Sequence, residues 1–184
     1  LGSRSTAIGT SALSNQNNTT ATDVYNTAVG FEAGGSVTTG VQNTLIGAQV
    51  GDALTDADFN TAIGYLALST DTLGSKSTAI GYAALKDQNF TTATDSFNVA
   101  VGHLAAENIT TGILNTIVGA QAGDALTDAD RNVAVGYAAL GSDTLGSRST
   151  ALGYATLSNQ NLTTATNALN VAVGYDAGKS VTTG

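Results

Sequence analysis

Cysteine, proline, methionine and tryptophan are absent from this chain of 184 residues, and aromatic residues make up only 5% of it. Without cysteine, no disulfide stabilises the fold. Large side chains are so scarce that a conventional globular core would be difficult to fill. Hydrophobic residues nevertheless make up 42% of the sequence, and that apolar surface needs burying, which argues against a disordered chain. The composition therefore predicts an ordered protein that is not a conventional compact globule.

Charged residues are also few, and acidic residues outnumber basic ones. The 6 Lys and Arg and 14 Asp and Glu give a net charge of −8. The basic residues are too scattered to form a phosphate-binding stripe, so we expect no nucleic-acid partner. No apolar run approaches the roughly 18 residues that a membrane-spanning helix needs, so we expect no membrane insertion by this segment.

The dominant feature of the sequence is a tandem repeat. A five-residue pattern occurs ten times, first as SerThrAlaIleGly at 5–9 and next as AsnThrAlaValGly at 26–30. The intervals between its final glycines are 21, 17, 17, 17, 21, 17, 17, 17 and 21 residues, which gives a super-repeat of 72. We therefore predict one repeat array over 1–184, divided into 1–72, 73–144 and a partial copy at 145–184. It reads as an excerpt of a longer fibre.

Each repeat unit, here called a coil, has the residue pattern of a strand. Positions are numbered from the final glycine of the motif, which is position 0. Position −4 is Asn or Ser, position −1 is Ile, Val or Leu, and position +1 is usually Tyr or Phe. Such β-branched and aromatic residues between Gly and Asn favour a strand, and apolar residues do not recur at helical spacing. We predict an all-β fold, a parallel β-solenoid (β-roll or β-helix) of ten coils of 17 or 21 residues.

Stacking at about 4.8 Å per coil predicts what each column of equivalent residues does. The Asn and Ser column should hydrogen-bond along the stack, and the glycine column should mark either a tight bend or close approach of another backbone. ThrThrAlaThr at 19–22, 91–94 and 163–166 should bulge out of the long coils as recurring loops.

Alternation along a strand separates the columns into two faces. We expect positions −1, +1 and +3 to point inward. Ile8, Val29, Ile46, Ile63 and Ile80 should then form one buried column, and Ile63→Asp should cost several kcal/mol.

The opposite face would carry small apolar residues, which predicts self-association. A strand that is apolar on both faces has only another chain to cover its second face. We expect a homotrimer whose chains meet at Ala28, Gly30, Ala62 and Gly64. The alternative is a single-chain rod with a bare surface of small residues.

The SerThrAlaIleGly motif with its following Ala resembles the SerValAlaIleGly repeat of trimeric autotransporter adhesin heads. It is also similar to the AsnThrAlaIleGlyTyr-type repeats of phage tail fibres and related bacterial fibre proteins. The resemblance implies a trimeric left-handed β-roll or related β-helix on a surface fibre or virion. The coils here are longer than the adhesin repeat, and the Tyr column with its 72-residue period is not part of that motif.

Residues that could support catalysis are few. His103 is the only histidine, and it occupies the +1 position that other coils give to Tyr, so we interpret it as structural. No other constellation suggests a catalytic site. We predict that the chain is not an enzyme and carries no catalytic or cofactor-binding residue.

Calcium is the one metal for which the sequence offers candidates. GlyAspAlaLeuThrAspAlaAsp at 51–58 recurs at 123–130, and its carboxylates are hard oxygen ligands. The candidate ligands are Asp52, Asp56, Asp58, Asp124, Asp128 and Asp130. The segment lacks the glycine and distal Glu of an EF-hand, so a solvated acidic turn is the alternative.

Two further surface functions have sequence signals. AsnXaaThr sequons begin at Asn17, Asn18, Asn89, Asn108 and Asn161, in a chain rich in both residue types. Thr at −3 in seven coils is a feature of ice-binding solenoids, but Val interrupts the column, and we expect −3 to share the buried side of −1.

Regular coils without unique insertions favour a structural fibre or shaft segment of an extracellular, cell-surface or virion appendage. One alternative is an adhesin that binds a host glycan or surface receptor through the repeat array. A tailspike-like enzyme is the third possibility.

Overall fold

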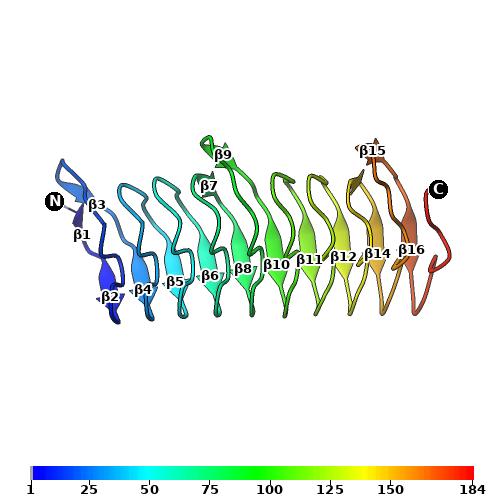
Figure 1. Ribbon diagram of the computed structural model, residues 1–184, viewed down its shortest axis with the longest axis horizontal. Coiled ribbons are helices and arrows are strands. Elements are labelled where there is room, and N and C mark those ends of the chain that lie inside the picture. The colour runs from blue at the N-terminus through cyan, green and yellow to red at the C-terminus, as the bar shows by residue number, and fades with distance from the viewer. Residues whose placement is uncertain (1) are drawn as a thin grey trace.

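The computed structural model describes residues 2–184 and shows a straight stack of parallel coils with its termini at opposite ends (Figure 1). No helix occurs in this range. One ten-stranded parallel sheet runs the length of the rod, with one strand from each coil. Its strands are β2 (Thr6–Ile8), β4 (Thr27–Val29), β5 (Thr44–Ile46), β6 (Thr61–Ile63), β8 (Thr78–Ile80), β10 (Val99–Val101), β11 (Thr116–Val118), β12 (Val133–Val135), β14 (Thr150–Leu152) and β16 (Val171–Val173).

The strands pair in the register that the repeat predicts. Thr27 pairs with Thr44 and Thr44 with Thr61, a shift of 17 residues, whereas Thr6 pairs with Thr27 across a long coil, a shift of 21. Equivalent residues therefore lie directly above one another. The all-β parallel solenoid with about ten turns is confirmed.

The long coils carry three small additional strand pairs. They are β1 (Gly2–Ser3) with β3 (Thr22–Asp23), β7 (Gly74–Ser75) with β9 (Thr94–Asp95), and β13 (Gly146–Ser147) with β15 (Thr166–Asn167). Figure 1 shows β9 and β15 on loops that rise above their neighbours. The tips of these loops, such as Thr91 and Thr92, are exposed. The predicted recurring loops are confirmed.

The predicted inward facing is confirmed at position +3, where residues such as Ala33 and Val50 are fully buried, and is wrong at positions −1 and +1. Position −2 points inward: Ala28 and Ala62 are fully buried. Position −1 points outward: Ile8 is 59% and Ile46 is 37% exposed, and Val29, Ile63 and Ile80 are partly exposed. Position +1 is outward too. Ala28 and Ala62 therefore cannot be the contacts between chains that the sequence suggested, and the surface is built from larger residues.

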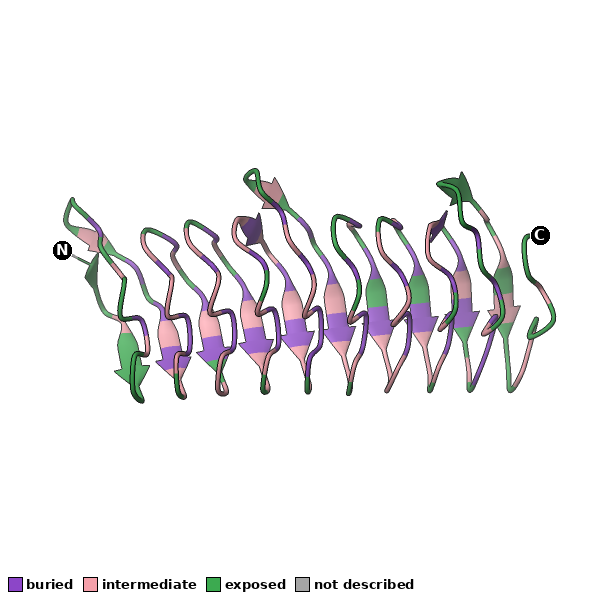
Figure 2. Ribbon diagram, viewed as in Figure 1, coloured by how far each residue is buried: buried purple, intermediate pink, exposed green. Residues whose placement is uncertain are grey.

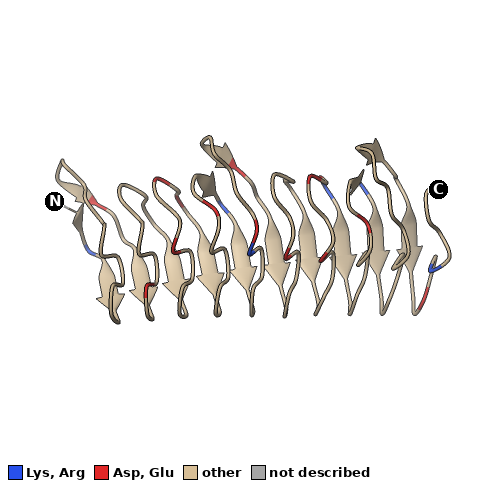
Figure 3. Cartoon of the chain, viewed as in Figure 1, with Lys and Arg blue, Asp and Glu red and all other residues tan. Residues whose placement is uncertain are grey.

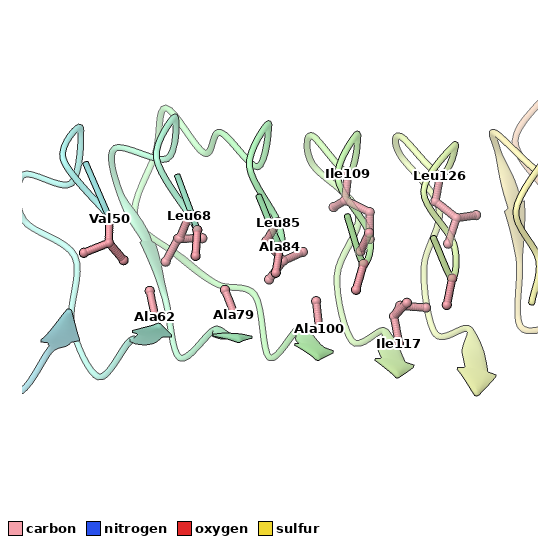
Figure 4. Packing of buried hydrophobic residues seen from close by; sticks show 14 of the residues in the cluster. Val50, Ala62, Leu68, Ala79, Ala84, Leu85, Ala100, Ile109, Ile117 and Leu126 are labelled. Atoms are coloured by element: carbon pink, nitrogen blue, oxygen red, sulfur yellow. The ribbon is translucent and has the colours of Figure 1, made fainter. Parts of the chain in front are cut away.

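The interior explains the reversal, because other positions already fill it. Leu at +4 or a branched apolar residue at +7 points toward the sheet from the opposite side of the coil (Figure 4). Alanine at −2 fits beneath Leu68 and Leu85. In two coils with glycine at +4, Gly51 and Gly123, the −2 residue is the larger Leu45 or Ile117; a Cβ on Gly51 would lie 2.9 Å from Leu45 Cδ2. In these coils the larger −2 side chain fills the space that Leu at +4 occupies elsewhere.

The glycine column confirms the expected close backbone approach. A Cβ on Gly30, at φ +142°, would lie 2.2 Å from the carbonyl oxygen of Gly47 in the next coil. The same clash recurs through most of the stack, so position 0 requires glycine.

Candidate functional site

The broadest continuous feature of the surface is the outward side of the ten-stranded sheet. It consists of positions −3, −1 and +1 in all ten coils, and we call it the uncharged face. Position −3 is Thr or Val, −1 is Ile, Val or Leu, and +1 is mostly aromatic. None of these residues is Asp, Glu, Lys or Arg, and in Figure 3 the ten strands carry no charge while the loops do.

Large apolar side chains are open to solvent on this face. Phe31, Tyr65, Tyr82, Tyr137 and Tyr154 are each 45–50% exposed. Figure 2 shows the strands as bands of buried and partly or fully exposed residues, which reflects the alternation of side chains. Water therefore contacts a long surface of Thr, aliphatic and aromatic side chains.

The +1 aromatics stack along one edge of the uncharged face. Tyr82 stacks on His103 with ring centroids 5.0 Å apart, and Tyr154 lies 5.2 Å from Tyr137 and from Tyr175. These distances follow from the spacing between coils and are within the favourable range for aromatic pairs. His103 occupies a place in this column that other coils give to tyrosine.

Beside this face, the −4 residues form a buried polar ladder. The Asn43 backbone N–H donates to Asn26 Oδ1 at 2.8 Å, and Asn43 Nδ2 donates to the Ala57 carbonyl at 2.7 Å. Asn60 makes the equivalent bonds one coil further on. Each amide links two coils, so the predicted Asn ladder is confirmed.

A polar cluster replaces the apolar interior at the boundary between super-repeats. Asp71 is fully buried, and its Oδ1 accepts from the backbone N–H groups of Gly74 and Phe90 at 3.1 and 2.9 Å. Gln88 Nε2 donates to Asp71 Oδ2 at 2.6 Å, and Asn98 Nδ2 donates to Gln88 Oε1 at 2.9 Å.

Asp143 and Gln160 repeat the arrangement in the next copy. Sequence reasoning missed this cluster, although Asp and Gln recur together at +7 in neighbouring coils. We interpret it as structural, because its carboxylate oxygens are taken up by protein donors.

The calcium candidates of 51–58 are distributed over separate turns. Asp56 Oδ1 accepts from Thr39 Oγ1 at 2.5 Å, and Asp58 Oδ1 accepts from the Val41 backbone N–H at 2.8 Å. Both carboxylates thus bind the preceding coil. Asp128 and Asp130 make the same bonds to Thr111 and Ile113. No group of three or more His, Cys, Asp or Glu within 2–184 is arranged to hold a metal ion.

Asp52 lies apart from Asp56 and Asp58, in a shallow polar pocket on another turn. The pocket lining also includes Ser11, Ser14 and Glu32. Burial raises the pKa of the Asp52 carboxyl, and the Glu32 carboxylate acts in the same direction. Asp124 has a raised pKa for the same reasons, with Glu107 in the role of Glu32. The pocket is small and acidic, and nothing in it suggests a reaction.

The sequons differ in accessibility. Asn17, Asn108 and Asn161 are exposed and Asn89 is partly exposed, whereas Asn18 is buried. For the ice-binding alternative, the assumption that −3 is buried proves wrong, because Thr at −3 lies on the uncharged face with the aliphatic −1 and aromatic +1 columns.

Comparison of the chain with protein-family models, with curated proteins and with solved structures finds no match. A search of residues 2–184 for a helix long and apolar enough to cross a membrane finds none.

Proposed function

We propose that this chain is a structural shaft segment of an extracellular, cell-surface or virion fibre. The β-solenoid fold is compatible with a fibre-like repeat protein. The observation that carries the proposal is the uniform in-register stacking of all ten strands, in which each strand of the long sheet repeats the pairing of the one before.

The excursions from this regularity support a spacer rather than a reaction centre. They are the four-residue additions in the long coils, and these recur every 72 residues. A specific catalytic site needs a unique arrangement of groups, whereas each of these loops has near copies. The segment therefore sets length and stiffness.

We further propose that the fibre contains more than one copy of the chain. Support comes from the uncharged face, which leaves apolar side chains in water on a single chain. Large exposed apolar patches commonly mark protein interfaces. The copies would meet on this face rather than at the small residues suggested by the sequence.

An adhesin is the second candidate, and the protruding loops favour it. Their exposed threonines stand in a row along one edge of the rod, at 19–22, 91–94 and 163–166. Repeated hydroxyl groups at regular intervals suit binding to a repetitive glycan. Replacing the threonines of all three loops by alanine should abolish binding to host surfaces if the adhesin function is correct and leave a pure shaft unaffected.

The shaft function is tested by changing the number of coils. Inserting a second copy of residues 73–144 after residue 144 should lengthen the particle by about 19 Å, four coils at ~4.8 Å each, without widening it. Small-angle X-ray scattering measures both dimensions. A matched insertion of the same residues in scrambled order should not lengthen the rod. Equal scattering curves for both insertions would contradict the proposal.

A further inference from the structure

We infer that the uncharged face is the docking surface for a second copy of this chain, with the two rods side by side along their lengths. This inference rests on the proposed fibre, and it replaces the contact residues suggested by the sequence with a defined surface. Ile63 and Val118, both at position −1, lie near the centre of this face.

The area of the face is sufficient for a stable interface. Ten coils at ~4.8 Å make it about 48 Å long, and five residues of extended chain from −3 to +1 make it about 16 Å wide. The product, roughly 750 Å², is close to the approximately 800 Å² that each partner contributes to a standard interface.

Charge selects this side of the rod. The chain carries 14 acidic and 6 basic residues, so two copies repel one another at most orientations. The uncharged face is free of both signs. Docking there keeps the acidic turns, such as those of Asp56 and Asp128, on other sides of each rod, and it places no charge in a dry interface.

The period of the face identifies the occupant as another copy. Its three columns present similar residue types in every coil. In the +1 column, the positions that lack an aromatic ring include two alanines 72 residues apart. Ala48 and Ala120 occupy +1 in coils where neighbouring copies of the motif have aromatic rings. An irregular globular partner would match this pattern over only a short length, whereas an identical rod has the same spacing throughout. Side chains of two sheets can then interdigitate along the whole interface.

The main test combines charge substitution with a measurement of mass. Ile63→Lys together with V118K should lower the mass by light scattering from that of a multimer to that of one 18.2 kDa chain. Because both side chains are partly exposed in the single chain, far-UV circular dichroism should stay unchanged. The matched control is Thr92→Lys together with T164K, which places the same charges on the loop tips and should leave a multimer.

A fluorescence measurement keeps the inference testable if the lysine variant does not fold. The chain has no cysteine, so I63C and T92C can each be labelled at one site with an environment-sensitive dye. Emission from I63C should be blue-shifted at high protein concentration and should shift to the red on dilution, whereas T92C should show neither.

The outcomes separate the two proposals. A multimer that persists in the lysine variant, with dilution-independent emission from I63C, overturns the docking surface and leaves the shaft intact. A wild-type chain that is monomeric at all concentrations overturns the docking surface too. Failure of the lengthening experiment overturns the shaft and says nothing against the face.

Discussion

Two kinds of coil alternate in pairs along the rod, and they fill the same interior in different ways. In one kind, Leu at +4 faces the sheet and +7 is polar, as in Leu68 with Asp71 and Leu85 with Gln88. In the other kind, +4 is Gly or Ala and +7 is a branched apolar residue, as in Gly51 with Leu54. The large apolar side chain is at +4 in one kind of coil and at +7 in the other, so every coil contributes one to the core.

The polar kind of coil occurs where the chain makes its long excursion. There the backbone N–H groups of Gly74 and Phe90 donate to a side chain. A buried carboxylate at Asp71 satisfies both, and Gln88 connects it to the Asn ladder. The buried Asp and Gln are thus confined to coils beside a long excursion, whereas the buried Asn ladder also runs through the regular coils.

The largest effect is expected for Asp71→Leu. This substitution gives a coil with a polar residue at +7 the same residue that an apolar coil has there, as at Leu54. Two backbone N–H groups and the Gln88 amide would lose their acceptor, so we expect a loss of about 4 kcal/mol in the free energy of unfolding. Urea denaturation followed by circular dichroism measures it. The control is Asp87→Leu on the surface, expected to change stability by less than about 1 kcal/mol. Equal effects would refute the role assigned to Asp71.

Leu45→Ala should cost about 3 kcal/mol, because it removes the side chain that fills the space above Gly51. Adding G51L should recover about half of this loss, since the pair would then match Ala62 and Leu68. The backbone permits it: φ is +52° at Gly51 and +55° at Leu68. Gly51→Leu alone should destabilise by overpacking. Strictly additive effects in the double-mutant cycle would show that the two positions do not share one space.

Gln88→Met should cost about 2 kcal/mol, less than the loss of Asp71. It retains the length of the side chain but removes one donor to Asp71 and the acceptor for Asn98. Gln49→Met, on a surface turn, is the matched control. Thermal unfolding of the two variants would separate them, and an equal midpoint for both would contradict the network.

The smallest effect concerns the half-buried Asp52 of an apolar coil, whose pKa is raised by burial. A raised pKa means that the folded state binds the proton more tightly than the unfolded state. The stability from Asp52 is therefore greatest below about pH 4 and is lost as the pH rises through its folded-state pKa. Asp52→Asn should stabilise the protein slightly at pH 7 and not at pH 3.5. A stabilisation equal at both pH values would exclude this origin.

The sequence predicts the regular part of this molecule well. Spacing between motifs determines the strands, their register and the long-coil loops, because stacking forces equivalent residues into columns. Alternation alone does not say which set of side chains faces in. Choosing the bulky Ile63 for the interior was wrong, since Leu at +4 and +7 already occupies it. Coils with Leu at +4 have Ala at −2, whereas Leu45 at −2 accompanies Gly51 at +4, and Ile117 accompanies Gly123. This inverse relation in side-chain size is the sequence signal that identifies −2 as an inward position.

The candidate site was less predictable for related reasons. Asp52, Asp56 and Asp58 are close in sequence, but the turns between them direct the carboxylates to different neighbours. The uncharged face emerges only when the facing is known, because −1 and +1 were assigned to the core. The Asp71 cluster depends on contacts between residues 17 apart, which local patterns do not reveal.

The hydrogen bonds between coils give the rod a particular mechanical response. They run along its axis, as in the bond from the Gly47 N–H to the Val29 carbonyl, so tension on the ends loads every coil and the end coils can release one after another. A released coil of 17 residues extends to about 58 Å in place of the ~4.8 Å it occupied. Single-molecule pulling should record steps near that length, and one all-or-none rupture would argue against sequential release. Such a filament would absorb a sudden load by lengthening more than tenfold at the yielding end while the coils behind it remain folded.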